Sequence, residues 1–292
     1  MADASGQAEI RGLHIDKLAK GFADEENVFK QFCTVSTTSA REIRWYKKTS
    51  GFLDSTDTTG ITASQIANTA ERALPVVVEQ SWTRQQSFVR KYFVESPTIS
   101  MEDIKDTDVD ILATNVRDLV RAVARQVDKR IYDVLTAGVG NTNAATATWD
   151  NATQANVNIV KDLLVAKKEI RTDGYNPEGA FLLVTPNDHE LMLTNLIFTK
   201  GSSIPAFASG QVSGSGVVME ILGLKVVVST NVDADEAVVV VPKRAMTWKS
   251  FVPMTSVVID NPGIGKKIRC WEEGEAIMTD INAASAITNL NT

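Results

Sequence analysis

Histidine and cysteine are scarce in this chain, whose 292 residues include two of each. With only His14 and His189, a histidine-based triad or a zinc site has few candidates. Cys33 and Cys270 are far apart and outside any CxxC pattern, which favours two free thiols in a reducing compartment over a disulfide framework. We therefore expect no cofactor and no metal site, and we assign no catalytic residue.

Long apolar runs and an excess of basic charge are also missing. No stretch approaches the roughly 18 to 20 apolar residues of a membrane-spanning helix, and the first ten residues lack the pattern of an export signal, so we expect no membrane partner. Lys and Arg total 30 against 36 Asp and Glu, a formal charge of -6. Proteins that grip phosphates usually present a net basic face, so tight nucleic-acid binding is not indicated.

Residues 1–40 have the composition of a docking arm. They carry four basic and six acidic residues, so the arm is not the basic tail that condenses nucleic acid by neutralising its charge. Its apolar residues predict short amphipathic helices that dock on another surface, which we expect to be a neighbouring chain. They are Leu13, Leu18, Phe22, Val28, Phe29 and Phe32.

Residues 41–48 predict an exposed β-ribbon. The run is β-prone and has charged residues on both sides of the strand, which a core strand could not bury without a large desolvation cost. A polar segment at 49–73 separates it from a second β-prone run at 74–94, and such a long connection is either disordered or contacts another chain, which we favour. The expected inter-subunit contacts are Arg41, Arg44, Trp45, Lys47, Lys48, Trp82 and Arg84.

The clearest helix is expected at about 108–137, where apolar residues recur every three or four positions. Thr107 and Asp110 form a plausible capping box, and Gly138 stands where a left-handed residue would end the helix. Four cations recur along this helix and could face DNA, but a solvated or inter-subunit face is the favoured interpretation. They are Arg117, Arg121, Arg125 and Lys129.

The rest of the chain mixes helices and strands. After a low-complexity loop at 138–153, a helix is expected at 154–172 and a buried strand at 181–184. Thr185 and Pro186 can cap and begin a helix that runs to about 196. Further strands are expected at 217–222, 224–228, 237–241, 256–260 and 266–280. The order is neither a regular βαβ series nor an all-β repeat, so the fold class is α+β.

Three local patterns have a chemical and a structural interpretation. Asp188-His189-Glu190 could serve a hydrolase, but acids in the first turn of a helix explain it better. The glycines of 210–216 lack the order of a phosphate-binding loop and predict a flexible connection. Asp106, Asp108 and Asp110 lack the glycine and glutamate of a calcium loop and fit a helix start.

Taken in order, these elements resemble the Hong Kong ninety-seven-type capsid fold of tailed double-stranded-DNA phages and encapsulins. The most telling segment is Ile221-Leu-Gly-Leu-Lys-Val-Val-Val-Ser-Thr-Asn231, similar to the family's apolar-Gly-x-Pro-Val-apolar pattern, with Lys225 where proline is common. The resemblance implies an L-shaped subunit with an N-terminal arm, an extended β-hairpin loop, a peripheral domain with a long spine helix, and an axial domain. The implied boundaries are 1–40, 41–96, 97–180 with 250–292, and 181–249, in that order.

The resemblance also implies a function. It identifies the chain as a major capsid protein, not an enzyme, which self-assembles as hexamers and pentamers into an icosahedral shell around double-stranded DNA. The implied partners are further copies of the chain, a separate scaffolding protein, a portal and a decoration protein, in a virion assembled in the host cytoplasm. An encapsulin-like compartment is the alternative, and a hydrolase using His189 is a weaker one. Lys47 or Lys48 would be the nearest donor for the isopeptide bond of some relatives, but ordinary exposed lysines are favoured.

Overall fold

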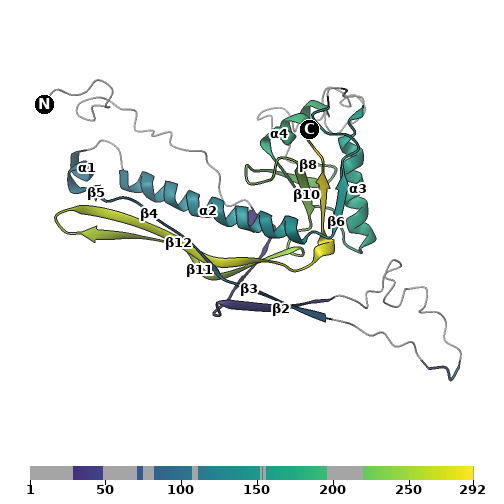
Figure 1. Cartoon of the computed structure of the whole chain (residues 1–292), viewed down its shortest axis with the longest axis horizontal. Helices are drawn as coiled ribbons and strands as arrows, with labels where there is room; N and C mark the ends of the chain where they lie inside the picture. The colour runs from purple at the N-terminus through teal and green to yellow at the C-terminus, as the bar shows by residue number, and fades with distance from the viewer. Residues whose placement is uncertain are drawn as a thin grey trace.

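The computed structural model describes residues 29–48, 71–74, 82–106, 111–151, 153, 156–195 and 220–291. The described elements form an L (Figure 1): a long helix beside a long hairpin makes one limb, and a body around a six-stranded sheet makes the other. A two-stranded ribbon leaves the corner between them. None of the helices in these ranges is long and apolar enough to cross a membrane.

The predicted spine helix is confirmed as α2 (Ile111–Gly138), roughly 42 Å long. Val127, Ile131 and Leu135 are fully buried because their spacing of about one helical turn places them on one face. The proposed cap at Thr107 and Asp110 lies outside the described residues.

The prediction that Gly138 ends α2 in a left-handed conformation is wrong, because Gly138 is the last residue of the helix and its φ is not positive. The glycine has a packing role instead. A Cβ at this position would lie 3.0 Å from Cγ and 3.2 Å from Cβ of Met278. The helix end and the end of the last long strand therefore approach so closely that a side chain at position 138 would have to displace Met278.

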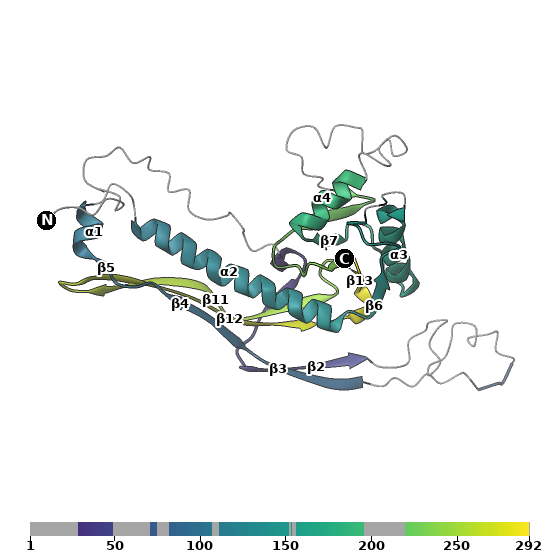
Figure 2. The same cartoon turned by 45° about the horizontal axis from the view of Figure 1, so that its top comes forward.

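The long limb is a five-stranded sheet in the order β1-β11-β12-β4, with β5 paired to β12. α2 lies along one face of this sheet (Figure 2) and packs on β12 and β4. Its strands and short helix are β1 (Thr34–Thr37), β4 (Arg90–Glu95), β5 (Ile99–Ser100), α1 (Met101–Asp106), β11 (Met246–Asn261) and β12 (Gly265–Met278). The predicted strand at 256–260 is only the outer end of β11, while that at 266–280 matches β12 closely.

The body is a six-stranded sheet in the order β6-β13-β10-β7-β9-β8, with α3 packed on β13 and β6. Its elements are β6 (Asn141–Ala144), α3 (Ile159–Thr172), β7 (Phe181–Val184), α4 (Pro186–Thr194), β8 (Glu220–Ile221), β9 (Leu224–Val228), β10 (Glu236–Val240), η6 (Ile281–Ala283) and β13 (Ala284–Thr288). The apolar runs predicted as strands β7, β9 and β10 form the buried centre of this sheet.

Two helices of the body begin at residues whose side chains cap them. The Thr185 hydroxyl accepts from the Asp188 backbone N–H at 3.0 Å, and Pro186 begins α4, as predicted. α3 begins five residues later than expected, because Asn158 caps it by accepting from the Lys161 N–H at 3.2 Å. Leu222 and Gly223, with φ of 52° and 75°, make the two-residue turn between β8 and β9, where the glycine relieves strain.

The segment predicted as a low-complexity loop at 138–153 contains a strand and a buried tryptophan among its described residues, so that prediction is wrong. Its first half forms β6, which pairs in parallel with β13. Its second half carries the fully buried Trp149, whose indole N–H lies 3.3 Å from the buried carboxylate of Asp162. The same carboxylate accepts from the backbone and hydroxyl of Thr146 at 2.9 and 2.6 Å. The strand β6 was not predicted because its side chains are small and mostly polar, and its pairing depends on its backbone.

The end of the predicted arm docks on its own chain. Phe29 and Phe32 are fully buried in the main core, and their rings lie 5.6 Å apart. β1 continues this contact by pairing in parallel with β11. The prediction that these two phenylalanines dock on a neighbour is therefore wrong, since both side chains are buried in the core of their own chain. The remaining predicted arm residues, Leu13, Leu18, Phe22 and Val28, lie outside the described part.

The strand pairing does not follow the domain boundaries that the resemblance implies at residues 181 and 249. β6 and α3 precede residue 181, and β13 follows residue 249, yet all three belong to the six-stranded body. Backbone pairing between distant segments brings these elements into the body, and local composition does not reveal such pairing.

Both cysteines are free, as predicted, and both are buried. Burial, with a smaller contribution from the Asp128 carboxylate, raises the pKa of the Cys33 thiol to about 12. Burial also raises the pKa of Cys270.

Candidate inter-subunit surface

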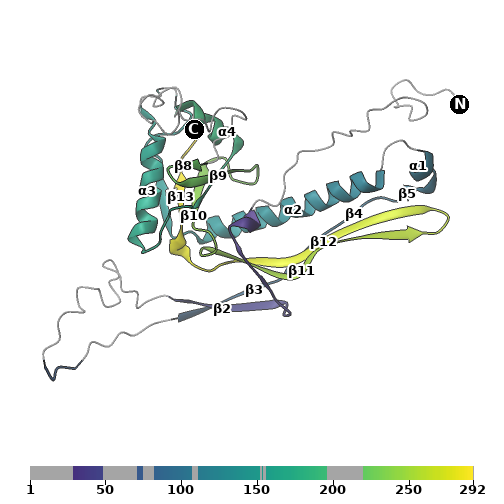
Figure 3. The same cartoon turned by 180° about the vertical axis from the view of Figure 1, so that it is seen from behind.

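The predicted ribbon is a separate two-stranded sheet of β2 (Glu42–Lys48) and β3 (Trp82–Phe88), paired antiparallel. Figure 3 shows it crossing the corner of the L and pointing away from the long limb. The second predicted run, 74–94, divides at Val89, because β3 pairs with β2 whereas β4 joins β12. Most of the polar segment at 49–73 lies outside the described residues.

The two faces of the ribbon differ in exposure. Ile43 is buried and Trp45 half-buried, and their partners Ser87 and Gln85 share that covered face. The opposite face carries three exposed aromatic side chains, with exposed fractions of 66% for Tyr46, 55% for Trp82 and 60% for Phe88. A two-stranded ribbon is at best marginally stable alone, so these rings lack the surface that would normally cover them.

Arginines accompany the aromatic side chains on this outer face. The Arg44 guanidinium donates to both carboxylate oxygens of Glu42, at 2.5 and 3.0 Å, which holds the pKa of Glu42 below its ordinary value. Arg84 pairs across the ribbon with Tyr46 and is also exposed. Aromatic rings and arginine are the residues that contribute most in protein interfaces.

The predicted contact residues are therefore divided between the two faces of the ribbon. Arg44, Trp82 and Arg84 lie on the outer face, and Trp45 lies on the covered face. The side chains of Lys47 and Lys48 lie outside the described part. Tyr46 and Phe88 were missed, although alternation along each strand places Tyr46 beside Arg44 and Phe88 with Trp82 and Arg84.

Arg41 stands at the base of the ribbon, where it joins the long limb. Its guanidinium lies 3.3 Å from the Glu273 carboxylate and 5.0 Å from the centre of the Phe251 ring. Lys91 of β4 approaches the same carboxylate at 3.6 Å. These ion pairs thus connect the base of the ribbon to β12, while the outer face of the ribbon stays exposed to solvent.

Two further buried glutamates of β12 bind cations from other parts of the chain. Glu272 is paired with Lys30 at 2.5 Å. Glu275, which is fully buried, is paired with Arg130 of α2 and, at 3.4 Å, with Arg90. The arm, the ribbon base and the spine helix therefore converge on one strand, and the cations offset the cost of burying its carboxylates.

The predicted basic stripe on α2 is engaged within the chain. Arg125 donates to the Thr230 hydroxyl at 3.0 Å, and Lys129 lies 2.9 Å from Asp233 and 3.1 Å from Asp133. Arg117 and Arg121 also have interaction partners. These contacts lie within one chain, so the favoured solvated or inter-subunit face and the contact with DNA both stay predictions.

The remaining chemical candidates do not assemble into a site. The Asp188 carboxylate accepts from the Thr185 hydroxyl at 2.6 Å and from the Asn291 amide at 2.9 Å, so it serves the helix start as expected. His189 is half-buried, and burial lowers its pKa. Among the described residues, no three His, Cys, Asp or Glu side chains are placed to hold a metal ion. The glycines of 210–216 and the acids at 108 and 110 lie outside them.

Comparison with known proteins decides the family. The profile of the phage capsid protein family matches residues 98–267, more than half of the chain. The chain belongs to the phage capsid protein family. The match spans α2, α3 and all of β11, so it includes the spine helix and part of the body, and it ends three residues into β12. No curated protein sequence matches this capsid protein.

Solved capsids share the fold of this capsid protein. The capsid of Cyanophage P-SCSP1u is similar with a TM-score of 0.68 and 10% identity, over all of this chain and 93% of that one. The mature capsid of bacteriophage PhiM1 gives 0.65 and 13%, over 92% and 88%. A virus-like particle from Pyrococcus furiosus gives 0.54 and 12%, over 93% and 94%. The predicted α+β Hong Kong ninety-seven-type fold and the structural capsid assignment are thus confirmed.

Proposed function

We propose that this capsid protein tiles hexamers and pentamers into an icosahedral shell around double-stranded DNA, and that each ribbon lies across a sister molecule. The exposed outer face of the ribbon carries the proposal. Tyr46, Trp82 and Phe88 are more than half exposed, although the chain has a large core of its own. Rings of this size remain in water only at a cost, and a neighbouring subunit would remove it.

Each part of the L-shaped subunit corresponds to one domain that the resemblance implies. The body corresponds to the axial domain and the long limb to the peripheral domain, while the ribbon is the extended loop. Many modest contacts of this kind stabilise a closed shell through multivalency. The net charge of -6 fits a lining over which packaged DNA slides, since the 36 acidic residues outnumber the 30 basic ones that could hold it. On this proposal the protein has no catalytic activity, and scaffolding, portal and decoration proteins are its other partners in the host cytoplasm.

Deleting residues 50–73 tests the role of the extended loop. The proposal expects a soluble, folded subunit that forms no shells, as judged by circular dichroism and negative-stain microscopy, because the deletion leaves the core and both sheets intact. Normal particles from the deletion variant would refute the role of the loop. Particles of the intact chain that carry protein cargo and no genome would favour the encapsulin-like alternative.

A further inference from the structure

The outward face of α3 is cationic. Its exposed positions are Lys161, Leu164, Lys168, Arg171 and Thr172, of which the first four lie three or four residues apart and so form one stripe. The acids of the helix, Asp162 and Glu169, are directed into the body, where they bind Thr146 and Ser285 respectively. In a chain with a net charge of -6, this helix face has three cations and no carboxylate.

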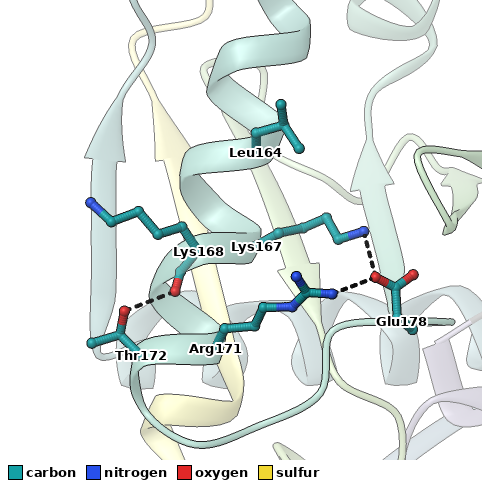
Figure 4. A pocket seen from close by; sticks show the side chains of 6 residues that line it. All are labelled: Leu164, Lys167, Lys168, Arg171, Thr172 and Glu178. Carbon is teal, nitrogen blue, oxygen red and sulfur yellow. Dashed lines mark hydrogen bonds and ion pairs between the residues drawn. The ribbon is translucent and has the colours of Figure 1, made fainter.

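A hollow of about 400 Å³ opens on this face. It is lined by Leu164, Lys167, Lys168, Arg171, Thr172 and Glu178. Figure 4 shows the Lys167 and Arg171 side chains converging on Glu178, while Lys168 extends to the other side. Lys167 and Arg171 donate to the same oxygen of Glu178, at 3.2 and 2.7 Å. The lining thus has three cations and one carboxylate, which pairs with two of them, so the hollow is net positive and suited to a further carboxylate.

Leu164 adds an apolar part to the same surface. Its side chain borders the hollow and is 49% exposed, so a partner that covered the stripe would also remove this leucine from water. A protein surface satisfies both requirements, whereas a polyanion such as DNA satisfies only the charge.

An acidic patch lies where the body meets α2. The segment after β9 rests on α2, where Lys129 pairs with Asp233 and Asp133, whose side chains are 59% and 47% exposed. Asp235 is exposed beside them. The patch thus has three exposed carboxylates, two of which pair with Lys129. Figures 1 and 3 show α3 on the side of the body that faces away from the N-terminal part of α2.

We infer that the α3 face binds the acidic patch of a second copy of this chain, with one carboxylate of that copy entering the hollow. The inference rests on the proposed function. A closed ring of identical subunits brings together two different patches of each neighbour, and charge complementarity fixes their register. The ribbon extends to the same side as α3 (Figures 1 and 3), so the copy that the ribbon crosses is the copy that α3 meets.

Zero-length cross-linking of assembled shells tests the inference directly. Shells are assembled from equal parts of unlabelled and ¹⁵N-labelled subunits and treated with a carbodiimide, which joins an amine to a carboxylate in direct contact. Mass spectrometry should find peptides that join Lys161 or Lys168 to Asp133, Asp233 or Asp235, with mixed isotope patterns that show two subunits. Shells that form normally but yield no such mixed-isotope peptide would overturn the inference and leave the proposed function intact.

A charge reversal supplies a second readout. Lys168→Glu should lower the yield of sedimenting shells by at least about tenfold, because each lost contact is repeated throughout the lattice. Lys105→Glu, which makes the same charge change at an exposed position of α1, should leave the yield unchanged. Circular dichroism should show both variants folded. Equal shell yields for the two variants would also overturn the inference.

Discussion

Gly274 of β12 lies flat against the indole ring of Trp248 on the adjacent strand β11. A Cβ at position 274 would stand 2.8 Å from Cε2 of Trp248 and nearer still to Cζ2, with the Lys249 carbonyl oxygen at 2.9 Å. Trp248 is 1% exposed, so the ring has no open space into which it can move. The glycine therefore permits the tightest approach between the two long strands, beside the buried glutamates that anchor the ribbon.

Gly274→Ala should destabilise the subunit by about 2 to 4 kcal/mol, because both the ring and a backbone carbonyl resist the added methyl group. Denaturant unfolding of the unassembled subunit measures the change. Combining it with Trp248→Phe, which shortens the ring, should cost less than the sum of the two single substitutions. Additive costs would show that the contact does not set the strand spacing.

Arg130→Met should cost about 3 to 5 kcal/mol, because it leaves the fully buried Glu275 with only the exposed Arg90 as a cation. Adding Glu275→Leu should recover most of the loss, since the uncompensated charge is then gone. The matched control is Arg44→Met, whose pair with Glu42 is exposed to solvent and should leave unfolding unchanged. Equal effects of the two arginine substitutions would contradict the anchoring role of Glu275.

Both thiols should be inert to a disulfide reagent in the folded subunit. Burial raises the pKa of Cys33 to about 12 and also raises that of Cys270, so almost no thiolate forms near neutral pH. Absorbance of the released reagent should appear only as denaturant unfolds the chain. A rapid phase from native protein would show that one of the two sites opens to solvent.

The half-buried His189 should titrate below its ordinary pKa of 6.5, since burial disfavours the charged ring. The unfolded chain then binds the proton more tightly, so the subunit loses stability as the pH falls below 6.5, and the loss ends once the folded form is also protonated. In a His14→Gln variant, NMR of the single remaining histidine gives the midpoint. His189→Gln should remove this part of the pH dependence, and a midpoint above 6.5 would contradict it.

Local patterns in the sequence predict the elements with strong periodicity or caps. The stripe of α2, the Thr185 cap with Pro186, and the apolar runs of β7, β9 and β10 were all found in this way. β6 and β13 were missed because their small or polar side chains carry no strand signal. Those strands are held by backbone pairing between segments more than 140 residues apart.

The candidate surface was only partly predictable for the same reason. Mixed charge and aromatic residues in 41–48 correctly indicated a ribbon outside the core. Glu272, Glu273 and Glu275 were not singled out, because carboxylates in a strand normally indicate exposure. Their burial depends on cations from the arm, the ribbon base and α2, a convergence that no local window contains.

An electron cryo-microscopy reconstruction of the assembled shell tests the central claim most directly, since it shows what covers the outer face of the ribbon. The account predicts that Tyr46, Trp82 and Phe88 pack against a neighbouring copy and lose most of their exposure. A shell in which these three rings face solvent, or lie on the core of their own subunit, would contradict it.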